Sequence, residues 1–270
     1  MISALTFHHG AVAEIAKDGI AAEVASRADG GFIWVHIQSN GQTESFLDDL
    51  SFELPPTVRR ALTAVETRPR CEPMESGVLV NMRVPSAATK PTHDGDLLVS
   101  VRLWAEAGLL LSVSFRPSTV VPLVEEKFRR GLLQDPGDVI IAMATASAEE
   151  IDPVVAALGD QLDDLESDLG PGTAFSERRL VTQLRTLAIG YRRFVNPQRL
   201  AFERLSQLPL DWLDDGERAA VREAADRFAR MTEELESVRE RAAVLHEELT
   251  DLRAEKMDGR SLQIAIVAMI

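Results

Sequence analysis

Hydrophobic runs in the first half of the chain have the length and composition of β-strands. Residues 32–37 (FIWVHI) and 78–84 (VLVNMRV) are two such runs. Residues 97–115 hold two more, joined by a short turn at 106–108, and predict a hairpin. Helices are expected at 55–66, which opens with prolines, and after Pro122 up to Gly131. We therefore expect an α+β fold in which an N-terminal mixed or antiparallel sheet with flanking helices occupies residues 1–137.

The hydrophobic period changes from about residue 138 onward. Apolar residues recur every three or four positions from Ile151 to Leu169 and again from Leu180 to Leu208, where only Gln198 interrupts the series. Turn-forming stretches at 170–176 (GPGTAFS) and 209–216 (PLDWLDDG) separate these segments from each other and from a third. This pattern predicts consecutive helices.

The third segment is the longest. Residues 217–258 contain neither Gly nor Pro, and a single helix of that length would extend roughly 60 Å. Its apolar positions keep strict three-four spacing, which is typical of long helices that pack lengthwise. We therefore expect a coiled-coil-like stalk over 138–258, built either as a three-helix bundle within one chain or as a surface that also packs against copies. The predicted seam comprises Val221, Phe228, Met231, Leu235, Val238, Leu245, Leu249 and Leu252.

Residues 259–270 end in an apolar run, IAIVAMI. No window of the chain reaches the roughly 20 apolar residues of a membrane-spanning helix. Two interpretations remain open from these residues alone: an apolar last turn of a water-exposed helix, or the beginning of a transmembrane helix.

The charge balance favours cations as ligands. The chain has 43 acidic and 29 basic side chains and a net charge of −14, which argues against binding to nucleic acid or anionic lipid. Cys71 is the only cysteine, which fits a reducing compartment. The N-terminal residues have neither the basic start nor the apolar core of a secretory signal, so we expect the chain to start in the cytoplasm.

Sequence motifs for catalysis are absent. No phosphate-binding loop, dinucleotide fingerprint, nucleophile elbow or zinc-protease motif occurs, and no Cys pair has zinc-ligand spacing. We therefore expect no enzyme activity and no cofactor. His36 lies in an apolar run and is expected to be a core or surface histidine with satisfied hydrogen bonds, and not a metal ligand.

One acidic stretch could attract a divalent cation. Asp160, Asp163 and Asp164 are spaced so that their carboxylates share one helix face. A solvated helix face is the alternative. The next helix is rich in arginine, which predicts an electrostatic match between these two helices.

The order of these segments resembles the CorA-type divalent cation transporter family, and most closely its zinc-transporting ZntB branch. The resemblance lies in residues 109–128, 184–205 and 212–270, while the first hundred residues match only in the order of their elements. The run RAEKMDGRSL, before the apolar end, is closer to the zinc branch than to the magnesium branch.

This resemblance implies a function. The chain would be the cytosolic portion of a homopentameric transporter at the bacterial inner membrane, with zinc as the transported or regulatory ion, or else magnesium or cobalt. Residues 259–270 would begin the first transmembrane, pore-lining helix, and the remaining transmembrane helices would be missing. Five copies would form a funnel that leads ions to the pore and regulates it. A coiled-coil scaffold with an α/β head is the alternative from another class.

Overall fold

The structure, a computed structural model, describes residues 1–26, 30–39, 43–49, 54–65, 67–88, 98–167 and 174–268. The chain divides into two compact units. Unit 1 comprises Met1–Ile151 and Phe194–Ala229, and unit 2 comprises Asp152–Arg193 and Arg230–Ile270. The sequence suggested boundaries after residues 137 and 258. The compact units divide differently because each long helix is shared between them, so those boundaries remain a prediction.

Unit 1 contains one mixed sheet, in the order β2-β1-β3-β7-β6-β5-β4. Only β3 and β7 pair in parallel, and all the other neighbours are antiparallel. The predicted runs all form strands, and the predicted hairpin is β6–β7. The strands are β1 (Ile2–His8), β2 (Ala11–Glu14), β3 (Phe32–Gln38), β4 (Arg70–Pro73), β5 (Val78–Pro85), β6 (Leu98–Glu106) and β7 (Leu109–Ser114).

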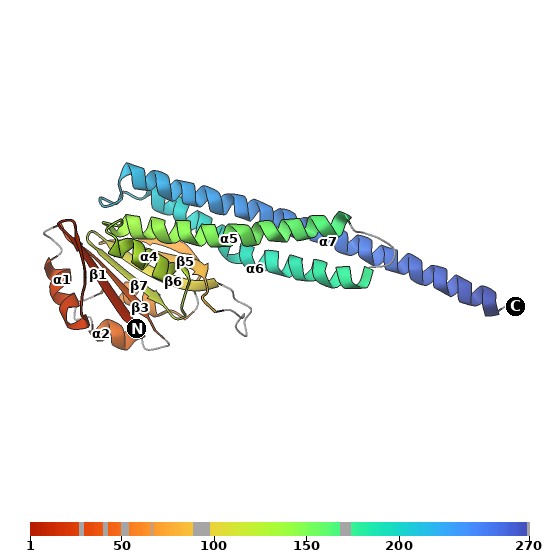
Figure 1. Cartoon of the computed structure of the whole chain (residues 1–270), viewed down its shortest axis with the longest axis horizontal. Coiled ribbons are helices and arrows are strands. Elements are labelled where there is room, and N and C mark those ends of the chain that lie inside the picture. The colour runs from red at the N-terminus through yellow and green to blue at the C-terminus, as the bar shows by residue number, and fades with distance from the viewer. Residues whose placement is uncertain are drawn as a thin grey trace. The chain divides into compact units, whose positions relative to one another are not determined.

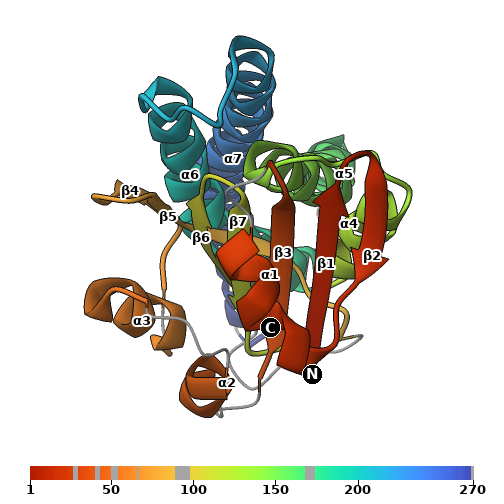
Figure 2. The same ribbon diagram turned by 90° about the vertical axis from the view of Figure 1, so that its left-hand side faces the viewer.

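Short helices cover both faces of the sheet (Figure 2). Side chains alternate between the faces along β3, so Trp34 and Val35 pack on opposite sides. Val35 belongs to the core cluster with helices α1, α2 and α3, whereas Trp34 packs against Phe128 of α4, with ring centroids 6.0 Å apart. The elements here are η1 (Lys17–Gly19), α1 (Ile20–Ser26), α2 (Thr43–Asp49), α3 (Pro56–Thr63) and α4 (Val120–Arg129). As predicted, a glycine terminates α4: Gly131 has a φ of 73°.

Three long helices make up the rest: α5 (Pro136–Ser167), α6 (Ala174–Gln207) and α7 (Asp215–Ala268). Figure 1 shows α7 as one unbroken helix. The expected mixed sheet followed by long helices is confirmed. Within unit 2, all three helices contribute buried apolar side chains, which are Val155, Leu158, Leu162, Val181, Leu184, Ala188, Tyr191, Met231, Leu235, Val238, Ala242, Leu245 and Leu249.

Gln198, which interrupts the apolar series of α6, has a structural role in unit 1. Its side chain is 1% exposed, and Oε1 accepts a hydrogen bond from the backbone N–H of Arg83 at 2.6 Å. Ser147 of α5 donates to the carbonyl of the same residue at 3.2 Å. Two helices therefore satisfy the backbone of β5 at Arg83, beyond the last residue that pairs with β4.

Candidate functional site

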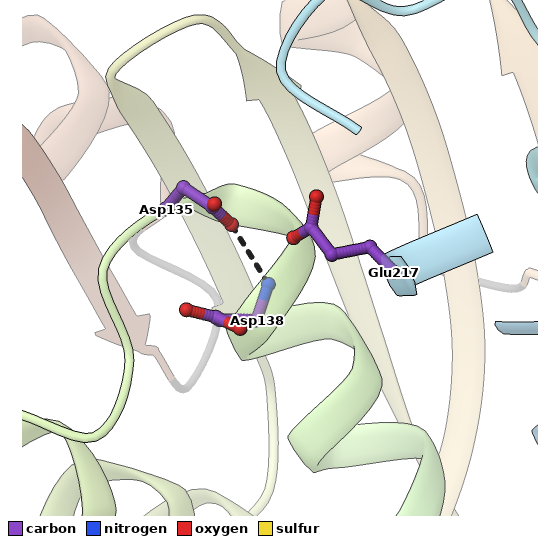
Figure 3. A group of neighbouring side chains, drawn as sticks. All are labelled: Asp135, Asp138 and Glu217. Carbon is purple, nitrogen blue, oxygen red and sulfur yellow. Dashed lines mark hydrogen bonds between the residues drawn. The ribbon is translucent and has the colours of Figure 1, made fainter. Parts of the chain in front are cut away.

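Three carboxylates meet at the beginnings of two long helices in unit 1. We call Asp135, Asp138 and Glu217 the carboxylate cluster. One oxygen from each lies within 4.8 Å of the others (Figure 3). Asp135 precedes α5, Asp138 lies in its first turn, and Glu217 lies in the first turn of α7. Among the described residues this is the only group of three or more potential metal ligands with such spacing.

Helix capping positions each member of the cluster. The backbone N–H of Glu217 donates to Asp214 Oδ1 at 2.8 Å, and Glu217 Oε2 accepts from the backbone N–H of Asp214 at 2.7 Å. This reciprocal pair is a capping box. At the start of α5, Asp138 N–H donates to Asp135 Oδ1 at 2.9 Å, and Asp138 Oδ2 accepts from Gln134 N–H at 2.8 Å. The D-x-x-E and D-x-x-D patterns could have revealed both caps, but only the fold brings them together.

A glycine permits the close approach of the two helix ends. A Cβ at Gly137 would lie 2.1 Å from Glu217 Oε1, so no other residue fits there without displacing the glutamate. Glu217 Oε1 is itself buried and accepts no hydrogen bond from the protein. The carboxyl group of Glu217 faces the other two carboxyl groups (Figure 3).

Two members of the cluster, Glu217 and Asp138, have raised pKa values. Burial, followed by the neighbouring carboxyl of Asp135, raises the pKa of Glu217 to about 8. Burial also raises the pKa of Asp138, with added repulsion from Asp135 and Asp214. The physical cause is that several negative charges share a partly dehydrated space. A bound proton or a bound cation would relieve this repulsion, and oxygen ligands of this kind suit hard divalent cations.

The sequence prediction placed the cation-attracting face elsewhere, on α5. In unit 2, Asp163 pairs with Arg241 of α7, which also binds Glu166, with Nε 3.0 Å from Oε1. Asp160 adds to the negative field that, after burial, raises the pKa of Glu234. Asp164 is exposed. Asp160, Asp163 and Asp164 therefore lie on one helix but have different surroundings, and cation binding by this face remains a prediction.

The predicted electrostatic match between α5 and α6 remains a prediction. In unit 2, ion pairs join α7 to each of the other two long helices. Arg241 of α7 binds the acidic residues of α5, and Arg192 of α6 binds Glu236 of α7 at 2.6 Å. α7 therefore supplies a basic partner to α5, which is Arg241, and an acidic partner to α6, which is Glu236.

The predicted seam of α7 is buried within a single chain. Val221 and Phe228 belong to the core of unit 1, where the rings of Phe228 and Phe202 lie 5.6 Å apart. The side chain of Leu252 lies outside the described residues. The remaining members, all at most 2% exposed and all in unit 2, are Met231, Leu235, Val238, Leu245 and Leu249. Contacts between copies along this seam remain a prediction.

A cavity of about 350 Å³ lies in unit 1 between strands β1 and β3 and helix α4. His36 lines it, but the ring nitrogens already lie 2.8 Å from Ser112 Oγ and 3.4 Å from Ser114 Oγ. This confirms a core histidine with satisfied hydrogen bonds. Burial lowers the pKa of His36 to about 4, so the ring is neutral at neutral pH.

The sequence left two interpretations open for residues 259–270, which end in an apolar run. Across the helices that the structure describes, none combines the length and the hydropathy of a membrane span.

Comparison with known proteins gives close relatives in sequence and in fold. The chain is 28% identical over 238 residues to the zinc transport protein ZntB of Pectobacterium atrosepticum, an alignment that covers 88% of this chain and 72% of that protein. ZntB of Cronobacter sakazakii is 27% identical over 241 residues, again with 88% and 72% coverage.

Solved structures agree with these relatives. Full-length CmaX superposes with a TM-score of 0.83 at 25% identity, over 98% of this chain and 81% of that one. The ZntB cytoplasmic domain from Vibrio parahaemolyticus gives a TM-score of 0.74 at 16% identity, over 94% and 98%. The complete CorA magnesium transporter from Methanocaldococcus jannaschii gives 0.78 at 13% identity, over 100% and 82%.

The family model described as CorA-like Mg²⁺ transporter protein matches residues 29–270. The match covers most of the chain, and the mixed sheet with long helices is the fold of the solved relatives. This chain therefore belongs to the CorA-like magnesium transporter family.

Proposed function

We propose that this chain is the cytosolic part of a membrane transporter for divalent cations, with zinc as the transported ion. The observation that carries the proposal is the agreement in length and fold with the ZntB cytoplasmic domain, which the chain matches over nearly all of both molecules. The ZntB names of the sequence relatives favour zinc over magnesium, although the family model is named for magnesium. Family membership also favours transport over the scaffold alternative.

The long helix α7 has a defined role in this proposal. In the assembled transporter, five copies surround a common axis, and α7 leads towards the pore with residues 259–270 at its entrance. The negative net charge of −14 raises the local concentration of divalent cations near the cytosolic mouth. Cations bound by carboxylates would bias the assembly towards a closed pore, because they remove repulsion between like charges. The match to the complete CorA magnesium transporter over all of this chain supports a role in transport.

Zinc preference can be measured directly on the purified chain. Isothermal calorimetry should give an affinity for Zn²⁺ at least about tenfold above that for Mg²⁺, a difference of roughly 1.4 kcal/mol. Equal affinities would instead support the magnesium alternative. Light scattering with and without zinc measures assembly, since a pentamer would have about five times the 29.7 kDa mass of one chain.

The aspartates on α5 are tested with Asp163 left unchanged, because Asp163 also pairs with Arg241. Asp160→Asn together with Asp164→Asn should weaken zinc binding if this face attracts the ion. Glu149→Gln, an exposed carboxylate on the same helix, is the matched control. Unchanged binding in the double variant would remove this face from the mechanism and leave the family assignment intact.

A further inference from the structure

Two buried polar side chains in unit 1 lie directly opposite each other without sufficient hydrogen-bond partners. Asn81 of β5 and Arg102 of β6 are Cα partners in the antiparallel register, so both side chains emerge on the same face of the sheet. Each is only 1% exposed. Buried polar groups are almost always hydrogen-bonded, so this pair requires an explanation.

Carbonyl groups at the end of α3 accept some of the hydrogen bonds that the Arg102 guanidinium can donate. Nη2 donates to the carbonyl of Ala64 at 2.5 Å and to that of Val65 at 3.1 Å, and the group lies 4.1 Å from the ring centroid of Phe115. A cation at a helix C-terminus is favourable there. The other two nitrogens, Nε and Nη1, are buried and have no acceptor.

Asn81 adds further unsatisfied groups beside Arg102. Neither Oδ1 nor Nδ2 of its amide has a hydrogen-bond partner. Donor nitrogens predominate at this position, because the two side chains together leave Nε, Nη1 and Nδ2 unused against one oxygen. A ligand that accepts hydrogen bonds is therefore favoured over one that donates them.

The charge of Arg102 is a second feature of this position. Among the ion pairs of the described residues, none involves Arg102 and a carboxylate. Burial, and secondarily the nearby charge of Arg83, lowers the pKa of Arg102 to about 10, which still leaves it charged at neutral pH. A water molecule could accept its hydrogen bonds but would not neutralise the charge. An anion does both, and so offsets the cost of burying an unpaired charge.

We propose that Asn81 and Arg102 bind one small monovalent anion of the halide or nitrate class inside the α/β unit. The low exposure of both side chains restricts the ligand to a small size, and the single buried charge sets its valence. This site is independent of the proposed transport function, because it lies in the sheet and uses none of the carboxylates considered above.

Anion identity should affect the stability of the wild-type chain. We expect its thermal midpoint to be about 3 °C higher in sodium bromide or chloride than in sodium gluconate at equal ionic strength, because gluconate is too large to enter. Arg102→Met should abolish this difference. Arg60→Met, which removes an exposed arginine from neighbouring α3, should retain it.

A second variant keeps the test decisive if Arg102→Met does not fold. Asn81→Asp places a carboxylate opposite Arg102, so this variant should fold and lose its response to the halide. Crystals of the wild-type chain soaked in bromide should give an anomalous peak beside Arg102 Nε or Nη1, and Asn81→Asp crystals should give none. A site that contains only water, or nothing, in the wild-type bromide data would overturn the proposal.

Discussion

At the residue scale, Glu217 combines two demands on one carboxylate. Its Oε2 completes the cap of α7 through the backbone N–H of Asp214, while its Oε1 is pressed against the start of α5. Capping needs only an acceptor, which a neutral side chain also supplies. The negative charge is therefore the costly part of this residue.

Replacing Glu217 by Gln should change how stability depends on pH. The folded-state pKa of about 8 lies above the ordinary value of 4.5, so the wild-type chain loses stability as pH rises from about 5 to about 8. Glu217→Gln keeps an acceptor for the cap and removes this loss. Its thermal midpoint should match wild type near pH 5 and exceed it near pH 8.

The matched control for Glu217 is Asp215→Asn, which neutralises an exposed carboxylate in the same turn. It should follow the wild-type pH profile. If wild type and Glu217→Gln lose stability equally between pH 5 and 8, the interpretation of Glu217 as the costly charge is wrong.

His36 should produce the opposite pH dependence. Its folded-state pKa of about 4 lies below the ordinary 6.5, so the neutral ring favours folding and stability falls as pH drops from about 6.5 to about 4. The full effect is about 3 kcal/mol. His36→Gln should flatten this part of the curve in urea unfolding, whereas His9→Asn, at an exposed turn position, should not.

At the scale of elements, the strands that sequence patterns predicted are those with long apolar runs. These inner strands are β3, β5, β6 and β7. They are buried on both faces, so their sequences are nearly continuous apolar runs that are easy to recognise. The edge strands β2 and β4 were missed, because they are four residues long and partly exposed. β1 was missed as well, and only its central side chains are buried.

The role of Gln198 becomes clear only from the contact between α6 and β5. Gln198→Leu continues the apolar series of α6 but leaves the Arg83 backbone N–H without its acceptor. We expect a loss of about 1 to 3 kcal/mol in the free energy of unfolding by urea. Gln207→Leu, at an exposed position of the same helix, is the control. A neutral or stabilising Gln198→Leu would show that the bond contributes nothing.

At the scale of the whole molecule, the seam of α7 connects folding with assembly. Leu235 is 0% exposed in a single chain, so Leu235→Ala should cost about 2 to 5 kcal/mol. This loss should not depend on protein concentration, because the contacts lie within one chain. Leu187→Ala, on the 42% exposed outer side of α6, should leave single-chain stability within about 0.5 kcal/mol.

Concentration is the variable that separates the two interpretations of the seam. Unfolding curves and light scattering at two protein concentrations would measure both variants. A cost of Leu235→Ala that appears only at high concentration would indicate that the seam serves contacts between copies.

The sequence by itself determined the central strands, the long helices and the family. Periods of two and of three to four residues identify strands and long helices, because each period places apolar side chains on one side of a locally regular backbone. The order of these elements indicated the transporter family, which the family match over residues 29–270 confirms.

Only the tertiary structure decided which distant residues meet. It joined Asp135 and Asp138 to Glu217, paired Asp163 with Arg241, and set Asn81 opposite Arg102. Helix and strand periods carry no information about which helix ends approach one another or which strands become neighbours. The carboxylate cluster and the proposed anion site at Asn81 and Arg102 follow from those long-range contacts, and therefore could not be predicted from local pattern.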